Sequence, residues 1–398
     1  MAESFFDVAV LGAGISGLSF AHHAARAGLR CLVLEEASAP GGCIHTARSD
    51  AGYWFELGAH TLYNSYAGLL DVLLAAGLRE AIQPRRKAPY RILVGDQVRS
   101  VPSQLAFGEL FASAWRIFTE RKAERSVGDY YGRLVGQRNW RRVFSPLFSA
   151  VPSQRADDFP AEMLFKRRPR RKDFPRTFTL QNGLGTLVDR LVRDERITLR
   201  INAGANALAR DDGGFAVSSQ DGSTVRARRL ALAMPPDRGA RLLAPLLPTT
   251  AAALARVATT AIDSTGVVVA KTALPLPRLA GLVPREDVFF SAVSRDVVPD
   301  DRWRGLAFHF RPGLDREARL ARIEAITGAK RTSFALVAEH HACLPSPALG
   351  HGAIVRAIDE SLPGSRVYVT GNYFGGLALE DCVLRSAAEV QRLLSENR

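Results

Sequence analysis

Residues 11–43, LGAGISGLSFAHHAARAGLRCLVLEEASAPGGC, decide the fold of this 398-residue chain. The apolar run before them, residues 6–11, is long enough for one buried parallel strand. A Gly-x-Gly-x-x-Gly motif then opens a predicted helix over residues 16–27, and Gly28 is a suitable C-terminal cap. A second apolar strand, Cys31–Leu34, follows, so the predicted order is strand, glycine turn, helix and strand.

The glycines and an acidic residue after the second strand together indicate a dinucleotide site. Gly12 permits the tight turn, Gly14 lets the backbone approach a pyrophosphate, and Gly17 lets the helix pack closely on the strand. The N–H groups at the helix start favour phosphate. Glu35 follows the second strand, where a carboxylate can bind the ribose hydroxyls. A strand–helix turn without a ligand is the alternative, and it leaves Glu35 unexplained.

A second glycine pair decides between the two common dinucleotides, NAD and FAD. Gly41 and Gly42 come after the acidic residue, and the aromatic stretch YWFELGAH, residues 53–60, follows. This arrangement resembles the FAD-binding pattern of the amine oxidase, protoporphyrinogen oxidase and phytoene desaturase superfamily. A second glycine pair lets the backbone approach the diphosphate or flavin from the far side, which NAD enzymes do not need there. The resemblance therefore implies FAD.

The chain departs from the family pattern directly after this glycine pair. The family usually has an arginine there that neutralises cofactor phosphate, whereas this chain has Cys43. Arg48 is near enough in the sequence to supply the charge, and His45 stands where a second basic residue is common. Ordinary packing is the first explanation for Cys43 and His45, and a covalent link to the flavin is the alternative.

The C-terminal segment also resembles this superfamily, and protoporphyrinogen oxidase most of all. It predicts a strand over residues 367–370, then Gly371-Asn372 and another glycine pair, and a closing helix over residues 381–394. The start of such a helix can direct N–H dipoles towards the flavin, where negative charge develops on reduction. Glu380 and Asp381 would oppose that charge unless they face away.

The motifs and the resemblance together imply a set of cofactor-binding residues spread along the chain. The residues expected to hold FAD are Gly12, Gly14, Ile15, Ser16, Gly17, Glu35, Glu36, Gly41, Gly42, Cys43, Gly58, Ala59, His60, Ala205, Ala233, Gly371, Asn372 and Leu379. By the same resemblance, Tyr373 and Phe374 lie near the isoalloxazine ring and wall the substrate site. His60 follows the aromatic strand and is the first candidate for a general base.

The predicted fold is α/β, with a Rossmann-like FAD-binding domain built from discontinuous segments. Residues 1–85, 174–260 and 344–398 form this domain, residues 86–102 and 261–343 form a substrate domain with a mixed β-sheet, and residues 103–173 are an inserted helical subdomain. Aromatic residues of the helical segment recur at spacings of three and four, which predicts a core-facing helix face: Phe107, Phe111, Trp115, Phe118, Tyr130, Tyr131, Trp140 and Phe144. A substrate channel or a membrane-facing patch is the alternative.

Composition narrows the class of protein. The chain is 47% apolar and long enough to bury a large core. It contains no run of about 18 apolar residues that would predict a transmembrane helix, and its first residues do not resemble a secretory signal. The four cysteines lack metal-ligand spacing, so we expect free thiols in the cytoplasm and no metal. The sequence does not indicate an oligomeric state.

The net charge of +13 is concentrated in two arginine-rich segments, residues 85–91 and 165–176. A solvated basic face is the first interpretation, and attraction to an anionic membrane or an anionic small-molecule substrate is the second. Nucleic acid is not expected, because no recognition module accompanies the charge. We therefore expect a cytoplasmic protein with a small-molecule substrate, which can also contact an anionic membrane from its periphery.

The expected chemistry is redox, carried out by the flavin, and no Ser-His-Asp set is needed for it. His309 lies between Phe308 and Phe310 on one predicted strand, so it faces solvent if the two rings fill the core. We predict an FAD-dependent oxidoreductase, an oxidase that takes hydride from a bulky, anionic organic substrate as protoporphyrinogen oxidase does. The alternatives are a flavin amine oxidase, a non-redox flavoenzyme such as a sugar mutase, and a non-catalytic FAD-bound scaffold.

Overall fold

The computed structural model describes residues 5–396 of the chain. The chain begins with β1 (Val8–Leu11), α1 (Ile15–Arg26) and β2 (Cys31–Leu34), the order that the sequence predicts. The helix starts one residue earlier than expected, because Gly14 is its N-cap in an extended conformation. No helix within these residues is long and apolar enough to cross a lipid bilayer.

Five parallel strands form the central sheet, in the order β10-β2-β1-β14-β20. The strands not yet named are β10 (Ile197–Arg200), β14 (Leu230–Leu232) and β20 (Val367–Val369). The four strands other than β10 are buried along their whole length, as expected for a parallel sheet covered on both faces. The predicted α/β class is confirmed, and segments far apart in the sequence build one layer.

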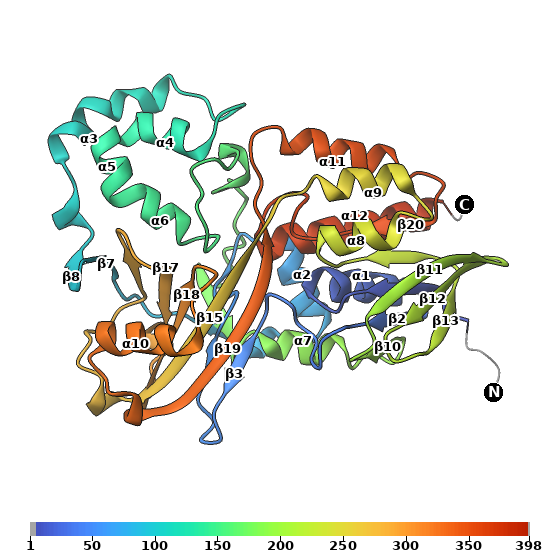
Figure 1. Cartoon of the computed structure of the whole chain (residues 1–398), viewed down its shortest axis with the longest axis horizontal. Coiled ribbons are helices and arrows are strands. Elements are labelled where there is room, and N and C mark those ends of the chain that lie inside the picture. The colour runs from blue at the N-terminus through green and yellow to red at the C-terminus, as the bar shows by residue number, and fades with distance from the viewer. Residues whose placement is uncertain (1–4, 397–398) are drawn as a thin grey trace.

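Helices cover both faces of the central sheet (Figure 1). One apolar cluster joins one face to α1, α2 (Ala67–Ala75), α7 (Gly185–Leu191) and α12 (Leu379–Ser395). A second cluster joins the other face to three helices and a small antiparallel sheet: α8 (Pro236–Leu243), α9 (Pro248–Ala255), α11 (His351–Glu360), β11 (Ala205–Asp211), β12 (Gly214–Ser219) and β13 (Thr224–Ala227).

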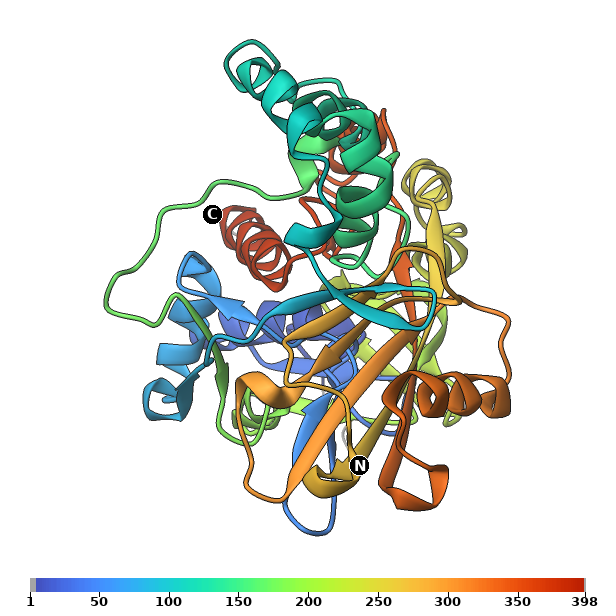
Figure 2. The ribbon, with the colours of Figure 1, turned by 90° about the vertical axis from the view of Figure 1, so that its left-hand side faces the viewer.

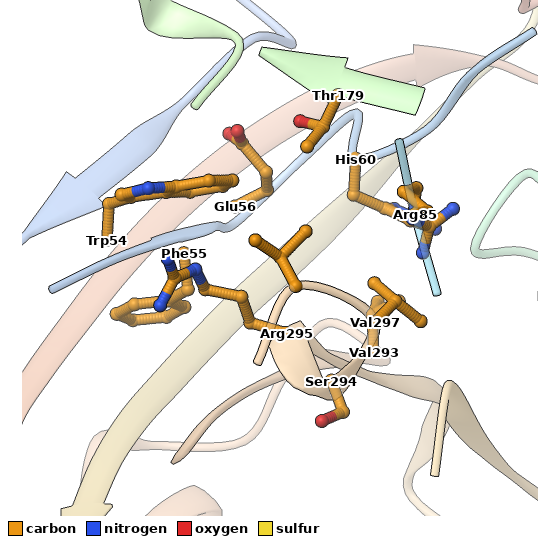
Figure 3. Close-up of a pocket in the computed structure, with 11 residues that line it drawn as sticks. Trp54, Phe55, Glu56, His60, Arg85, Thr179, Val293, Ser294, Arg295 and Val297 are labelled. Atoms are coloured by element: carbon orange, nitrogen blue, oxygen red, sulfur yellow. The ribbon is translucent and has the colours of Figure 1, made fainter. Parts of the chain in front are cut away.

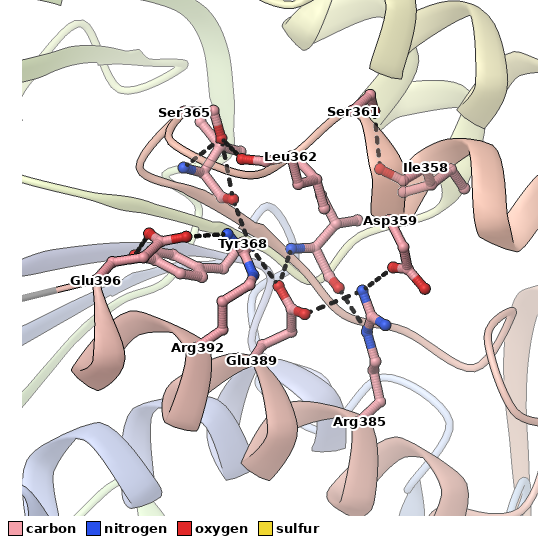
Figure 4. A network of polar contacts seen from close by, with 12 residues as sticks. Ile358, Asp359, Ser361, Leu362, Ser365, Tyr368, Arg385, Glu389, Arg392 and Glu396 are labelled. Carbon is pink, nitrogen blue, oxygen red and sulfur yellow. Dashed lines mark hydrogen bonds and ion pairs between the residues drawn. The ribbon is translucent and has the colours of Figure 1, made fainter.

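A polar network ties α12 to the central sheet and to α11 (Figure 4). Glu389 is buried, and its carboxylate accepts a hydrogen bond from the backbone N–H of Val369 at 3.2 Å. The guanidinium groups of Arg385 and Arg392 contact the same carboxylate at 3.1 and 2.7 Å. Arg385 also contacts Asp359 of α11 at 2.7 Å. The Glu389 carboxylate therefore joins α12 to β20, and Arg385 extends the network to α11.

A second, seven-stranded sheet lies beside the first, in the order β19-β15-β18-β17-β16-β7-β8. Its neighbouring strands are antiparallel, apart from β16 and β7. The strands are β19 (Phe334–Pro345), β15 (Thr259–Ala270), β18 (Trp303–Phe310), β17 (Phe289–Ser294), β16 (Gly281–Pro284), β7 (Tyr90–Val94) and β8 (Gln97–Ser100). One face packs against α10 (Arg316–Thr327).

The other face of this sheet is covered by the aromatic stretch that the sequence places near the flavin. β4 (Trp54–Glu56) pairs with β3 (Thr46–Arg48) and lies directly on the sheet. A Cβ built on Gly266 of β15 would lie 2.1 Å from the Phe55 ring. The chain after β4 therefore emerges between the two sheets.

A further small sheet and several short 3₁₀ segments complete these layers. This sheet has the order β5-β9-β6, from β5 (Leu62–Tyr63), β9 (Thr177–Leu180) and β6 (Ile82–Pro84). The 3₁₀ segments are η1 (Arg79–Ala81), η2 (Pro102–Gln104), η5 (Ala161–Met163), η6 (Lys271–Ala273), η7 (Arg295–Val297) and η8 (Arg331–Ser333).

Residues 103–173 contain several short helices. They are α3 (Phe107–Ser113), α4 (Val127–Val135), α5 (Gln137–Asn139) and α6 (Ser145–Ser149), with a 3₁₀ segment η3 (Ala114–Phe118) and a π-helical segment η4 (Trp140–Phe144). The division of the chain into three domains stays a prediction.

The prediction that the aromatic residues of these helices share a core-facing side is wrong for four of them. Phe107, Phe111, Trp115 and Phe118 are exposed. The chain breaks into short helices, and these four rings are not among the residues of the small cluster around Trp140. Trp140 is buried, and Tyr130, Tyr131 and Phe144 pack against its cluster.

Candidate active site

The glycine turn after β1 lies at the carboxyl edge of the central sheet. Gly12 has φ +107°, and a Cβ there would lie 2.4 Å from the carbonyl oxygen of Ala233, which follows β14. A Cβ on Gly17 would lie 1.9 Å from the carbonyl oxygen of Gly12. The two positions require glycine for the fold itself, because β1, α1 and β14 approach one another through bare backbone.

Gly14 differs from its two neighbours in the motif. A Cβ on Gly14 would find the Cα of Gly42 at 3.8 Å, an ordinary contact. The second glycine pair runs past this point, since the Gly41 N–H donates to the Ala13 carbonyl at 2.9 Å. Gly14, the N-cap of α1, has no side chain that could cap the helix start, and the first turn contains no acidic residue. The space beside Gly14 is therefore bordered by backbone and by open N–H groups, which suits a diphosphate.

Glu35 lies at the end of β2 beside the same turn. Its carboxylate accepts hydrogen bonds from the N–H groups of Ala13 at 2.6 Å and Ala37 at 2.9 Å. The side chain is half-buried, so part of it remains accessible to ribose hydroxyls. Glu36 is exposed and forms an ion pair with Arg238.

The residues after β4 meet the second glycine pair. The Ala59 N–H donates to the Cys43 carbonyl at 2.9 Å, and a Cβ on Gly58 would lie 2.2 Å from that same oxygen. Burial raises the pKa of the Cys43 thiol to about 11, so the thiol stays neutral. Arg48 contacts Asn182 and Asp189 instead of the glycines, so it does not replace the family arginine.

The acid of the aromatic stretch, Glu56, has a structural role. It is buried, and its carboxyl group accepts hydrogen bonds from Thr46 Oγ1 at 2.8 Å and from the Leu184 N–H at 2.7 Å. Burial raises its pKa to about 7. The side chain therefore joins β3 and β4 to the start of α7.

The two acids at the start of α12 face away from its open end. Glu380 accepts hydrogen bonds from the N–H groups of Gly68 and Leu69 at 3.0 and 2.9 Å, and so caps α2. Asp381 pairs with Arg168 at 2.7 Å and with Lys166 at 3.1 Å. Both negative charges are thus satisfied elsewhere, which removes the objection that they oppose a reduced flavin.

The start of α12 also lies close to the glycine turn. α12 begins at Leu379, two residues before the predicted start. The hydroxyl of Ser386 donates to the Ser16 carbonyl of α1 at 2.8 Å. Gly371 and Asn372 follow β20 at the carboxyl edge of the same sheet. The predicted binding segments from both ends of the chain are therefore neighbours.

His60 lines a small cavity between β4 and β17 (Figure 3). Its Nδ1–H donates to the Gly58 carbonyl at 3.2 Å, which leaves Nε2 as a hydrogen-bond acceptor. Burial, Arg85 and His309 together lower the His60 pKa to about 3. A histidine this weakly basic is a poor general base at neutral pH. The cavity of about 30 Å³ is lined by Trp54, Phe55, Glu56, His60, Arg85, Thr179, Val293, Ser294, Arg295, Val297 and Val298.

A row of polar residues crosses the seven-stranded sheet on the face that meets β4. His340, Ser264 and His309 occupy directly paired positions on β19, β15 and β18. Ser264 Oγ and His309 Nδ1 are 2.9 Å apart, and the His340 ring stacks on His45 with centroids 4.3 Å apart. The expectation that His309 faces solvent is wrong: Phe308 and Phe310 fill the core, and His309 is buried because this opposite face is also covered.

Tyr373 and Phe374 are buried in the apolar cluster between the central sheet and helices α9 and α11. Their ring centroids are 4.8 Å apart, and the guanidinium of Arg385 lies 3.7 Å from the Phe374 ring centroid. They are not among the residues that line the cavity beside His60. A catalytic role for them stays a prediction.

A family comparison agrees with this geometry. The model of the family described as flavin containing amine oxidoreductase matches residues 15–394. The chain belongs to this family. It is an FAD-dependent oxidoreductase, and FAD is its cofactor. The predicted superfamily membership is therefore confirmed.

Curated relatives match a short stretch of the chain. It is 32% identical over 81 residues to the 15-cis-phytoene desaturase of Narcissus pseudonarcissus, which is 20% of this chain and 14% of that protein. It is also 32% identical over 76 residues to the 15-cis-phytoene desaturase of Synechococcus elongatus, 19% of this chain and 16% of that protein. The chain thus aligns with less than a fifth of the length of these relatives.

Solved structures share the fold over nearly the whole chain. A protein provisionally assigned as a protoporphyrinogen oxidase, from Exiguobacterium sp. 255-15, has TM-score 0.79 and 20% identity and covers 99% of this chain and 100% of its own. A reduced UDP-galactopyranose mutase has TM-score 0.74 and 16% identity, with 98% and 96% covered. Putrescine oxidase has TM-score 0.69 and 18% identity, with 98% and 99% covered. Identities this low establish the fold alone.

The residues around the glycine turn fit FAD. The strip beside Gly14 is free of side chains, the helix behind it is uncapped, and Glu35 stands at the end of the next strand. The sequence did not predict the polar row through Ser264, because it does not show the register between strands. Arg85 was predicted only as one residue of a basic segment, and its place beside His60 was not predicted.

Proposed function

We propose that this FAD-dependent oxidoreductase is an oxidase of bulky, anionic organic substrates, as protoporphyrinogen oxidase is. Arg85 carries the proposal. Its guanidinium lines the cavity beside His60 and donates to the Thr61 hydroxyl. Its Nε is buried without a hydrogen-bond partner, and no acidic side chain among residues 5–396 forms an ion pair with it. Burial lowers its pKa.

Arg85 is half-buried, and a cation partly removed from water without a counter-charge is unfavourable unless a ligand supplies one. A substrate carboxylate would do so, with a charge-assisted hydrogen bond from the Arg85 guanidinium. His60 would accept a hydrogen bond at Nε2 from an N–H or O–H of the same substrate. These two residues would bind and orient one end of the substrate between the sheets, and the apolar part of the lining, Trp54, Phe55 and Val297 among it, would limit the access of water.

The cofactor site is part of the same proposal. We infer that FAD is held by Gly12–Gly17, Glu35, Gly41–Cys43, Gly58–His60, Ala233 and the segment from Gly371 to Leu379, with Glu36 and Ala205 at its edge. The packing of α1, β14 and α12 around one turn supports this set. FAD, when bound, accepts a hydride equivalent from the substrate.

The test is anaerobic mixing of the yellow holoprotein with protoporphyrinogen and with its dimethyl ester, which lacks the two negative charges. We expect the acid to bleach the flavin absorbance at least tenfold faster than the ester at equal low concentration. Arg85→Gln should remove the difference between the two substrates without removing the cofactor. Flavin that dithionite reduces but neither substrate reduces would contradict the oxidase proposal.

The cellular location is also a proposal. We infer a cytoplasmic protein that contacts anionic membrane from one side. The basic segment at residues 165–176 is partly neutralised within the molecule, since Arg168 pairs with Asp381 and Arg171 pairs with Asp71. Its remaining charge supports attraction to an anionic surface.

A further inference from the structure

The α3–η3 tip, residues 107–118, lies at the outer end of the helical segment (Figures 1 and 2). Several large apolar side chains of this tip are exposed. The exposed fractions are 51% for Phe107, 76% for Phe111, 59% for Trp115, 63% for Ile117 and 89% for Phe118. Single exposed apolar residues are ordinary, but several within twelve residues form a patch of the kind that marks an interaction surface.

The helix at the base of this tip has inverted amphipathicity. Glu109 turns inward, where its carboxylate accepts hydrogen bonds from the N–H groups of Arg138 and Asn139, both at 3.0 Å. Phe107 and Phe111, one helical turn apart, face outward. Glu109 is only half-buried, but in water it is unfavourable to leave the two phenylalanine rings exposed on the outer side of the helix. The arrangement becomes favourable where the surroundings of the tip are apolar.

Basic residues accompany the tip. Residues 103–176 contain 16 basic and 8 acidic residues, so less than a fifth of the chain carries +8 of the net charge of +13. Arg121, Arg141 and Arg142 are exposed, and no ion pair holds them within the part of the chain that the structure describes. The Arg116 guanidinium lies 5.7 Å from the Trp115 ring centroid, so aromatic and cationic groups meet at the tip.

We propose that the α3–η3 tip inserts into the interfacial layer of a bilayer that contains anionic phospholipid. The aromatic side chains of the tip would then lie at the acyl-chain boundary, away from water. The arginines would lie at the headgroups and contact the phosphates. A second copy of the chain is a poorer occupant, because it would bring two positively charged segments together. The proposal does not depend on the identity of the substrate or on Arg85.

Co-sedimentation of the holoprotein with vesicles tests the proposal. We expect binding to vesicles of phosphatidylcholine with phosphatidylglycerol, and at least tenfold weaker binding to phosphatidylcholine alone. The double variant Phe111→Ser/Phe118→Ser should bind the mixed vesicles at least tenfold more weakly. The matched control Ile201→Ser/Leu349→Ser removes two apolar residues that are 42% and 54% exposed elsewhere, and it should bind like the native chain.

Trp115 supplies a readout of insertion. The other tryptophans, Trp54, Trp140 and Trp303, are buried or half-buried. Lipids brominated on their tails should therefore quench a fluorescence component that disappears in Trp115→Phe, while that variant still binds. Flavin absorbance of each variant shows that it is folded before binding is measured.

Three results would overturn the proposal. One is native-like binding of the Phe111→Ser/Phe118→Ser variant to mixed vesicles. Another is equal binding to neutral and anionic vesicles. The third is a change from dimer to monomer in the double variant without vesicles, measured by sedimentation velocity, which would assign the tip to self-association.

Discussion

Gly14 and Gly17 belong to one motif, and the structure predicts opposite consequences when each gains a side chain. At Gly14 the backbone is extended, with φ −70° and ψ 175°, and the nearest atom to a new Cβ is 3.8 Å away. At Gly17 a new Cβ lies 1.9 Å from the Gly12 carbonyl oxygen, and backbone must move. Gly14→Val should therefore remove FAD binding from a folded chain, whereas Gly17→Ala should damage the fold.

The magnitudes follow from the same contacts. In Gly14→Val, the less favourable N-cap and the stiffer unfolded chain act in opposite directions, so the free energy of unfolding of the apoprotein should change by less than about 1 kcal/mol. Free FAD at a hundredfold excess over its dissociation constant stabilises the native chain by about 2.7 kcal/mol. This increment should vanish in Gly14→Val. In Gly17→Ala, overpacking should lower the stability of the apoprotein itself by about 1–3 kcal/mol or more.

The assay is urea unfolding of the apoproteins with and without added FAD, together with the flavin-to-protein absorbance ratio after gel filtration. The free energy of unfolding of the native chain should rise when FAD is added, and that of Gly14→Val should not. The apoprotein of Gly17→Ala should have a lower free energy of unfolding than the native apoprotein. Stoichiometric yellow cofactor in folded Gly14→Val would refute the assignment of this turn to the diphosphate. An unfolded Gly14→Val apoprotein would refute the inference that the folded chain has room for a side chain at this position.

Three further predictions concern stability. Burial raises the Glu56 pKa from 4.5 to about 7, so between these two pH values the folded chain holds a proton that the unfolded chain releases. The free energy of unfolding should therefore fall by roughly 3 kcal/mol as the pH rises through this interval, and then level off. Urea titrations at several pH values should show this profile, and Glu56→Gln should flatten it. Glu389→Ala leaves two arginines without their shared carboxylate and should lower the free energy of unfolding by about 3–5 kcal/mol. The matched variant Glu396→Ala removes a more exposed carboxylate and should lower it by less than about 1 kcal/mol. Gly266→Ala forces a Cβ into the Phe55 ring and should lower the thermal midpoint by an amount equivalent to about 1–3 kcal/mol; an unchanged midpoint would contradict the close packing of β4 on the sheet.

The first strand, helix and second strand were predictable because their signals are local. Glycines that the turn requires, an apolar run and an acid at fixed spacing reveal the element order, and the structure moves the helix start by one residue. The start of α12 at Leu379 was harder, because Glu380 and Asp381 find their partners in α2 and in residues 166–168. Contacts with distant segments determine that boundary.

The candidate site was predictable in its cofactor half and less so in its substrate half. The glycine segments converge because parallel strands end at one edge. The neighbourhood of His60, His309 and Arg85 depends on the pairing of strands far apart in the sequence and on the layer between the two sheets. Periodicity also predicted that Phe111 and its neighbours share a face, but periodicity cannot say whether protein covers that face.

The place of β20 and α12 in the central sheet has a consequence for the synthesis of the chain. β1 and α1 leave the ribosome long before α12, which Ser386 ties to Ser16. Until then, the apolar face of α1 has no cover from α12, and β14 lacks its neighbour β20. Contacts this distant in sequence form slowly and leave apolar surface exposed during folding. We therefore expect nascent chains to depend on chaperones until α12 is made. Chains that stop before residue 367 should be degraded without binding FAD.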